Sequence, residues 1–278
     1  MKNLTRWLPL ALLLPALATA GEPRVGVQLW SVKDDLAADF EGTLRAVSDL
    51  GFEGVEFARN YGPFEGDPEG LKALLDQLGL TCIGAHVDFT MISAEQLAAS
   101  LDYHQRLGCQ SMVVAMDHRA FAEDGVNWVI AELNLVAEKL DGTGMVTGYH
   151  NHWQEFATHG DATFWDTIAQ HTSDDVVLQL DVGNMQPAGM DPVAYVRRYP
   201  GRTWSSHFKA TLPEGASGRP IIGDDAIDWP GLLAAVREVG GTAWLIVEQE
   251  EYPDGLSPLD AVALSRAGLV AYMKGETP

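Results

Sequence analysis

Short runs of apolar and often β-branched residues alternate along the chain with longer segments in which apolar residues recur every three or four positions. The short runs do not alternate strictly between apolar and polar residues, which is typical of parallel strands that are buried on both faces. We expect eight such strands, at residues 25–30, 55–58, 81–86, 111–116, 145–150, 176–181, 204–209 and 243–248.

The segments between the strands carry signals that begin and end helices. Asp67 before Pro68 predicts an N-cap with proline at the first helical position, and Gly79 predicts the end of that helix. Ser93 and Gln96 predict a capping box. We expect helices at residues 36–50, 67–79, 93–107, 127–140, 163–171, 191–199 and 229–239, and a last helix after Ser257.

Eight strand–helix units in one chain of this length predict a single (β/α)₈ TIM barrel of the α/β class. The alternative is a doubly wound open sheet. That fold would normally carry a glycine-rich phosphate-binding turn after its first strand, and the residues after Val27 (QLWSVKDD) contain no glycine. In a barrel the carboxyl ends of all strands meet at one mouth, where such enzymes carry out their chemistry.

The first twenty residues have the pattern of a secretory signal peptide. Lys2 and Arg6 form a positive region, residues 8–14 form a short apolar run, and residues 18–20 (ATA) form a small-residue cleavage site. The apolar run is too short to span a membrane. We therefore predict a signal peptide at residues 1–20, a barrel at residues 21–278, no membrane association after cleavage, and secretion to the periplasm.

The formal net charge of −21 narrows the range of partners. An acidic surface repels the phosphates of nucleic acids, so we exclude nucleic acid as a partner. Most of the acidic side chains are expected to lie on the solvated surface, which leaves those at strand ends for a functional interpretation.

Two cysteines, Cys82 and Cys109, lie at the beginnings of two predicted strands that would be neighbours in a barrel. We interpret them as small buried apolar residues rather than as a disulfide. An oxidising compartment keeps the disulfide open as the alternative. Neither cysteine lies at the carboxyl end of a strand, so neither is a candidate nucleophile.

Seven of the eight predicted strands end in, or directly precede, a side chain that can titrate or bind a metal. Asp181, His207 and Glu248 lie at the ends of three successive strands. Two carboxylates and one imidazole suit Mn²⁺, Co²⁺, Zn²⁺ or Mg²⁺, so we predict a metal site that contains these three residues. The other strand-end groups are Glu56, His86, Asp117, His150 and His152.

The fifth strand is expected to supply a further ligand. It ends in YHNHWQE, from Tyr149 to Glu155. His150 and His152 are two residues apart and would face the same side of an extended strand, with Asn151 on the other side. His150 is the first candidate ligand, and Glu155 is the alternative. His152 is expected to orient a ligand or the substrate by hydrogen bonding.

These motifs resemble those of a known group of barrels. The runs VGVQLWSVKDDL from Val25, GFEGVEF from Gly51, LDVGN at 180–184, HFK at 207–209 and IVEQE at 246–250 are similar to the xylose-isomerase-like barrel superfamily. The run GYHNHWQEF at 148–156 resembles a fifth-strand motif of its secreted sugar phosphate isomerase/epimerase-like proteins. The resemblance extends from Val25 to Glu250 and implies the fold and metal chemistry, whereas the superfamily's enzymes act on varied substrates.

The resemblance also implies a ligand set. In the ketose epimerases of this superfamily, a metal is held by Glu, Asp, His and Glu from strands five to eight, and the two glutamates form the acid–base pair. Asp181, His207 and Glu248 match the last three positions, whereas His150 or the adjacent Tyr149 stands at the first. We therefore predict one divalent ion held by His150, Asp181, His207 and Glu248, with Mn²⁺ as first choice and Co²⁺, Zn²⁺ or Mg²⁺ as alternatives.

The expected chemistry is the removal of a proton next to a carbonyl group of a small-molecule carbohydrate. Glu248 is the leading general base. The other candidate catalytic residues are Glu155, His152, Lys209 and His86. The candidate substrate-binding residues are Glu56, Trp30, Trp153 and Asn151.

Three functions remain open from the sequence. The first is a metal-dependent isomerase or epimerase that acts on a keto-sugar or cyclitol. The second is a lyase or hydratase that eliminates the C1 substituent of a 3-keto-glycoside with one base, one acid and the same metal site. The third is a sugar-binding barrel without activity. Because His150 stands where the epimerases carry a glutamate, the sequence puts an epimerisation by two glutamates in doubt.

Overall fold

Eight parallel strands close into one barrel in the computed structural model, which describes residues 21–213 and 215–278. The order around the barrel is β1-β10-β9-β8-β5-β4-β3-β2. The predicted signal peptide at residues 1–20 lies outside the described residues. The strands are β1 (Arg24–Gln28), β2 (Gly54–Phe57), β3 (Thr81–Val87), β4 (Ser111–Val114), β5 (Val146–His150), β8 (Val176–Asp181), β9 (Ser205–Lys209) and β10 (Trp244–Glu248).

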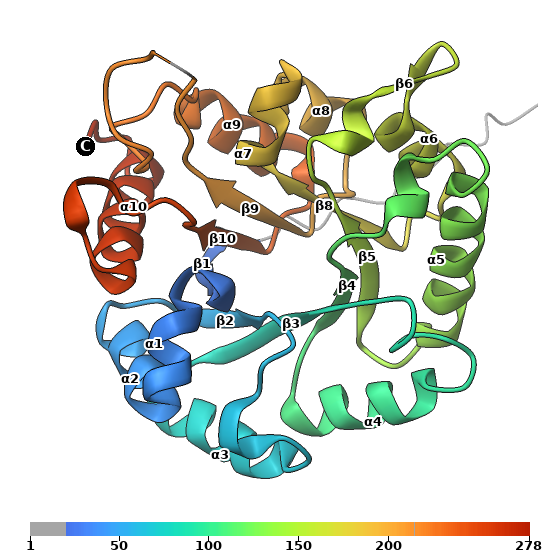
Figure 1. Ribbon diagram of the computed structural model, residues 1–278, viewed down its shortest axis with the longest axis horizontal. Coiled ribbons are helices and arrows are strands. Elements are labelled where there is room, and N and C mark those ends of the chain that lie inside the picture. The colour runs from blue at the N-terminus through green and yellow to red at the C-terminus, as the bar shows by residue number, and fades with distance from the viewer. Residues whose placement is uncertain (1–20, 214) are drawn as a thin grey trace, which may run out of the picture.

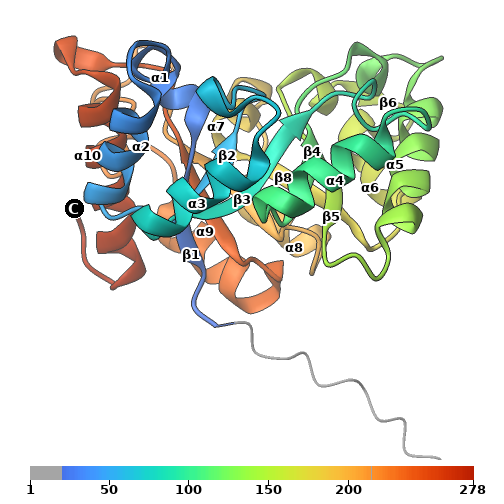
Figure 2. The same ribbon diagram turned by 90° about the horizontal axis from the view of Figure 1, so that it is seen from below.

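Helices form a ring outside the strands (Figure 1), which confirms the predicted (β/α)₈ TIM barrel. They are α1 (Lys33–Ala38), α2 (Phe40–Asp49), α3 (Pro68–Leu78), α4 (Leu97–Leu107), α5 (Val126–Leu140), α6 (Phe164–His171), α7 (Val182–Met185), α8 (Pro192–Arg198), α9 (Trp229–Ala235) and α10 (Pro258–Met273). Figure 2 places α10 on the same side of the barrel as α1 and α2, as expected when the last strand pairs with the first. Among the described residues, no helix is both long and apolar enough to cross a membrane.

The helix signals in the sequence are confirmed in part. Asp67 Oδ1 accepts a hydrogen bond from Gly70 N at the start of α3, and Gly79 ends that helix with φ of 68°. The helix predicted at residues 36–50 is instead two helices, because Asp39 is extended and its side chain caps α2 by accepting from Gly42 N. The capping box predicted at Ser93 is also wrong, because α4 begins at Leu97, four residues later.

Large apolar side chains fill the barrel near the amino ends of its strands. Ile83, Trp244 and Ile246 form a buried cluster there. Gly26 and Gly54 make room for it, since a Cβ atom on either residue would overlap the Ile83 side chain. This apolar cluster, the floor of the barrel, fills its interior at the amino ends of the strands. The inward-facing polar side chains therefore lie toward the carboxyl ends.

Cys82 and Cys109 form a disulfide, so the interpretation as two free buried cysteines is wrong. Cys82 lies on β3, and Cys109 lies two residues before β4. The two strands pair directly in the barrel, which brings both thiols to one place. The sequence predicts that the two strands are neighbours, but it does not predict that the Cys82 and Cys109 side chains point toward each other.

We expect Cys109→Ser to lower the free energy of unfolding by about 3–4 kcal/mol, because the bond closes a loop of moderate length in the unfolded chain. Denaturant unfolding with and without a reductant would measure this. The reductant should destabilise the wild-type protein and leave the variant unchanged. Equal stability of wild-type and variant proteins under oxidising conditions would contradict the bond.

Candidate functional site

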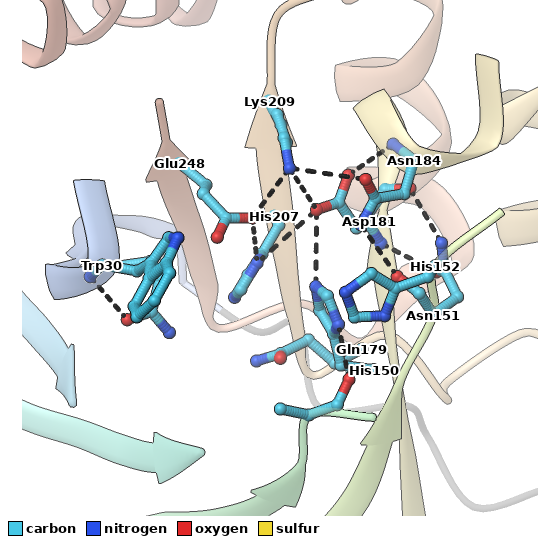
Figure 3. A network of polar contacts seen from close by, with 12 residues as sticks. Trp30, His150, Asn151, His152, Gln179, Asp181, Asn184, His207, Lys209 and Glu248 are labelled. Atoms are coloured by element: carbon cyan, nitrogen blue, oxygen red, sulfur yellow. Dashed lines mark hydrogen bonds and ion pairs between the residues drawn. The ribbon is translucent and has the colours of Figure 1, made fainter. Parts of the chain in front are cut away.

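Four side chains from four strand ends converge at the mouth of the barrel. They are His150 on β5, Asp181 on β8, His207 on β9 and Glu248 on β10. Each offers one nitrogen or oxygen atom, and the four atoms all lie within 4.8 Å of one another. All four side chains are buried. β8, β9 and β10 are consecutive neighbours in the barrel, so their inward-facing residues meet (Figure 3).

The atoms of this cluster that face one another fit a cation. His150 Nε2 and Asp181 Oδ2 lie 3.4 Å apart, and both are buried without a hydrogen-bond partner among the described residues. His207 Nδ1 lies 3.0 Å from Glu248 Oε2 and 3.9 Å from Asp181 Oδ2. Buried polar atoms without partners are costly, and a divalent ion would satisfy both. The mixed nitrogen and oxygen set suits Mn²⁺, Co²⁺, Zn²⁺ or Mg²⁺.

Hydrogen bonds at the back of the cluster fix its orientation. His150 Nδ1 lies 3.1 Å from the carbonyl oxygen of Ala115. Because a carbonyl can only accept, Nδ1 carries the proton and Nε2 keeps its lone pair toward the cluster. Asp181 Oδ1 accepts from Asn184 N at 2.8 Å, which leaves Oδ2 to face the other ligand atoms.

Glu155 is not part of the cluster, so the expectation of a ligand or catalytic group at this position needs correction. Its carboxylate is fully buried. Oε1 accepts from the Tyr149 hydroxyl at 2.9 Å, and Oε2 accepts from the backbone N–H of His152 at 2.9 Å. Both oxygens therefore stabilise the turn after β5. Of the two fifth-strand candidates, only His150 points into the cluster.

Two expected substrate contacts are also replaced by structural ones. Asn151 is fully buried, and its amide pairs with the Asp181 backbone in both directions, at 2.9 Å and 3.1 Å. It therefore holds the end of β8 in place. Glu56 is fully buried as well and lies 2.6 Å from His207 Nε2, on the side of the ring that faces away from the cluster.

A cavity of about 310 Å³ opens in front of the cluster. His150 and Glu248 belong to its wall, together with two other candidate residues, His86 and His152. Nδ1 of His152 is buried without a partner among the residues described. Trp30 also lines the cavity and is 45% exposed, so it offers an open apolar face, whereas Trp153 is 56% exposed and is not among the lining residues.

Lys209 places a positive charge beside the two carboxylates of the cluster (Figure 3). Its Nζ lies 3.9 Å from Asp181 Oδ2, 3.7 Å from Glu248 Oε2 and 2.8 Å from Glu250 Oε2. Burial raises the pKa of Asp181 to about 8. Burial would also raise the pKa of Glu248, but Lys209 and His207 outweigh it and hold that pKa well below its usual range.

Sequence reasoning missed two buried glutamines, Gln28 and Gln179, whose amides contact Glu56 and His86. Gln179 lies two residues before Asp181, so the two-residue period of the strand was a signal that could have found it. It also missed Met116 and Arg59, which line the cavity. Arg59 has an unusual φ of 59° and pairs with Asp88, a contact between loops that no sequence pattern reveals.

Comparison with known proteins gives one family match and several relatives. A family described as "Xylose isomerase-like TIM barrel" matches residues 44–269. An inosose dehydratase of Lacticaseibacillus casei is 23% identical over 271 residues, which cover 84% of this chain and 90% of that protein. The rhizopine catabolism protein MocC of Rhizobium meliloti is 23% identical, and the match covers 82% of this chain and 80% of that protein. A solved structure of a sugar phosphate isomerase/epimerase from Parabacteroides distasonis has a TM-score of 0.75 and 21% identity. The match covers 92% of this chain and 97% of that chain.

We expect Glu155→Gln to lower the free energy of unfolding by about 1–3 kcal/mol, because the new amide nitrogen cannot accept one of the two hydrogen bonds. Urea unfolding would measure the change. Binding of divalent metal should stay at the wild-type level. Unchanged stability together with lost metal binding would contradict this assignment and would indicate that Glu155 is a metal ligand.

Proposed function

We propose that this chain, which belongs to the xylose isomerase-like TIM barrel family, is a metal-dependent dehydratase or lyase acting on a keto-polyol. The substrate class is a keto-sugar or a keto-cyclitol. The reaction removes the proton next to the carbonyl carbon and expels the oxygen substituent on the next carbon.

The position of Glu155 is the observation that carries this proposal. Its carboxylate is tied to Tyr149 and to the His152 backbone, so it cannot act as a second acid–base glutamate. Glu248 is the one carboxylate that both belongs to the cluster and lines the cavity, and Glu250 at the same wall is paired with Lys209. An elimination needs one base and one acid rather than two opposed glutamates. The inosose dehydratase relatives favour the same reaction class.

The residues of the cluster have two roles in the proposed reaction, metal binding and proton removal. A divalent ion, with Mn²⁺ as first choice, would be held by the cluster of His150, Asp181, His207 and Glu248 and would polarise the carbonyl of the bound substrate. Glu248 removes the α-proton as general base. Burial would raise the pKa of Glu248, but Lys209 and His207 hold it below its usual range, so the carboxylate is ionised at neutral pH.

The remaining candidate residues bind substrate or handle protons. Lys209 stabilises the negative charge that develops on the substrate oxygen. The electron pair of the broken C–H bond forms the new double bond, and the β C–O bond breaks. His152 in its imidazolium form protonates the leaving oxygen, so a hydroxyl group leaves as water and a glycosidic oxygen leaves as an alcohol. Glu248 then releases the proton it took, and His152 takes one up, which restores both groups. His86 and Trp30 line the cavity and contact the hydroxyl groups and one face of the sugar.

Isomerisation or epimerisation is the second candidate, because it shares the first proton transfer. His152 is a second proton carrier at the cavity and could return the proton to the carbon skeleton. The solved sugar phosphate isomerase/epimerase structure supports this only through its fold. A sugar-binding barrel without activity is the third candidate, and the paired and oriented ligand atoms argue against it.

We also propose that the protein acts outside the cytoplasm, in the periplasm. The pattern of residues 1–20 indicates a signal peptide. The bond between Cys82 and Cys109 supports the proposal, because disulfides persist in oxidising compartments.

We expect Asp181→Asn and His207→Ala to lose bound divalent metal, because each removes one atom of the cluster. Elemental analysis after dialysis would measure occupancy, and circular dichroism would show that the barrel remains folded. Glu155→Gln is the matched control and should retain metal. Full occupancy in both cluster variants would remove the site from this account.

Reaction with a keto-cyclitol and a 3-keto-glucoside in D₂O, followed by NMR, would separate the candidate functions. We expect loss of water or release of free alcohol, and a rate at least about two orders of magnitude lower for Glu248→Gln. A product that keeps all the heavy atoms of the substrate and carries deuterium at the α-carbon would favour the isomerase. No reaction and no exchange with either substrate would contradict the proposed function.

A further inference from the structure

Glu56 lies inside the barrel, on the side of His207 opposite to the cluster, and its carboxylate is saturated with donors. Oε2 accepts from Gln28 Nε2 at 2.7 Å and from His207 Nε2 at 2.6 Å. Oε1 accepts from Gln179 Nε2 at 2.7 Å. Glu56 and all three partners have no exposed surface, so these contacts are not exchanged with solvent.

The backbone of β2 aims this side chain into the barrel. Glu56 lies two residues after Gly54, where a Cβ atom would meet the Ile83 and Trp244 side chains, so the two-residue period of the strand turns Glu56 inward as well. The register of β2 with β3 shifts between Val55 and Glu56, but the extra residue is Ile83 on β3, and β2 itself stays regular against β1. Glu56 is also the register partner of Gln28 on β1, so these two side chains meet.

The chemistry of the carboxylate fixes which nitrogen of His207 carries a proton. An ionised carboxylate only accepts hydrogen bonds, so His207 must donate through Nε2–H. Nδ1 is then the nitrogen that offers a lone pair to a cation, on the side where Asp181 and Glu248 lie at 3.9 Å and 3.0 Å. The His207 ring is thereby fixed in both orientation and tautomer.

The same network reaches a second histidine at the cavity wall. Gln179 donates both amide hydrogens, to Glu56 and to Ser205 Oγ at 2.9 Å, so its Oε1 remains as an acceptor. His86 Nε2 lies 2.9 Å from this oxygen and must donate to it. The His86 and His207 rings stack, with centroids 5.3 Å apart.

We propose that Glu56 is a positioning residue that holds His207 through Nε2 so that Nδ1 is presented to a divalent cation in the cluster. Glu56 itself touches neither the cation position nor the cavity. It acts through His207 by orienting the ring and by making the imidazole a stronger donor to metal. This inference rests on the proposed metal-dependent function, because it assigns a role toward the same ion.

Glu56→Gln tests the inference with little change in shape. The amide offers one acceptor oxygen where the carboxylate offered two, so one buried donor loses its partner and His207 loses its anionic anchor. We expect Co²⁺ affinity to fall by about 10- to 100-fold, as measured by calorimetry on metal-free protein. The visible absorption spectrum of the Co²⁺-loaded variant should shift, because the ligand field at His207 changes.

Ser205→Ala is the matched control. It removes a buried hydrogen bond from Gln179 in the same network and leaves the contact between Glu56 and His207 in place. We expect wild-type Co²⁺ affinity and an unchanged Co²⁺ spectrum, whatever the effect on thermal stability. Glu56→Asp keeps an anion at a greater distance from His207 and should fall between wild-type protein and Glu56→Gln, which also covers the case that Glu56→Gln does not fold.

The outcomes separate this role from the proposed function. Wild-type protein that binds no divalent metal would overturn the proposed site and this inference together. Wild-type protein that binds Co²⁺, with equal affinity and an identical spectrum in the Glu56 variants, would overturn the positioning role alone. A spectrum that shifts equally in Ser205→Ala would also overturn it, because the effect would then be a general loosening of the core.

Discussion

The charged side chains at the mouth of this barrel are buried, and the need to pair each of them with an opposite charge determines how the site is arranged. Glu56 and His207 are fully buried, Glu248 is 5% exposed and Lys209 is 9% exposed. Isolated charges in such positions would be very costly, so each must have a partner of opposite sign. With no cation in the cluster, His207 meets this requirement by bridging Glu56 and Glu248: burial opposes its charge, but these carboxylates raise the pKa of His207 to about 10. A divalent cation in the cluster would take the place of the proton on Nδ1. Lys209 spans Glu248, Asp181 and Glu250 from the other side.

The fold makes this arrangement possible because the barrel interior is apolar at the amino ends of the strands and polar at their carboxyl ends. Ile83, Trp244 and Ile246 fill the barrel at the amino ends of the strands. On β10 the same inward-facing row continues from Trp244 and Ile246 to Glu248, so one strand supplies both the floor and the cluster. The strand order places β10 beside β9 and β9 beside β8, which brings residues that are far apart in sequence into contact. Chemistry therefore concentrates at one end of the barrel.

The barrel and three members of the cluster could be predicted from the sequence because they follow from simple periodicities. Asp181, His207 and Glu248 end buried strands, and strand ends of a parallel barrel share one mouth. The choice between His150 and Glu155 could not be made, because it depends on how the turn after β5 folds back to place Glu155 against Tyr149. The inward direction of Glu56 follows from the two-residue period of β2, but its contact with His207 joins two strands that are not neighbours in the barrel, and no local residue pattern reveals it. Side-chain contacts between elements, such as the disulfide, were beyond the reach of local patterns for the same reason.

The central claim is that one divalent cation is held where His150 Nε2, Asp181 Oδ2, His207 Nδ1 and Glu248 meet. Anomalous diffraction from crystals of Mn²⁺-loaded protein, recorded on both sides of the manganese absorption edge, tests it most directly. The account predicts a single strong anomalous peak within bonding distance of these four side chains. The absence of a peak there from fully loaded crystals, or a peak held by other residues, would contradict it.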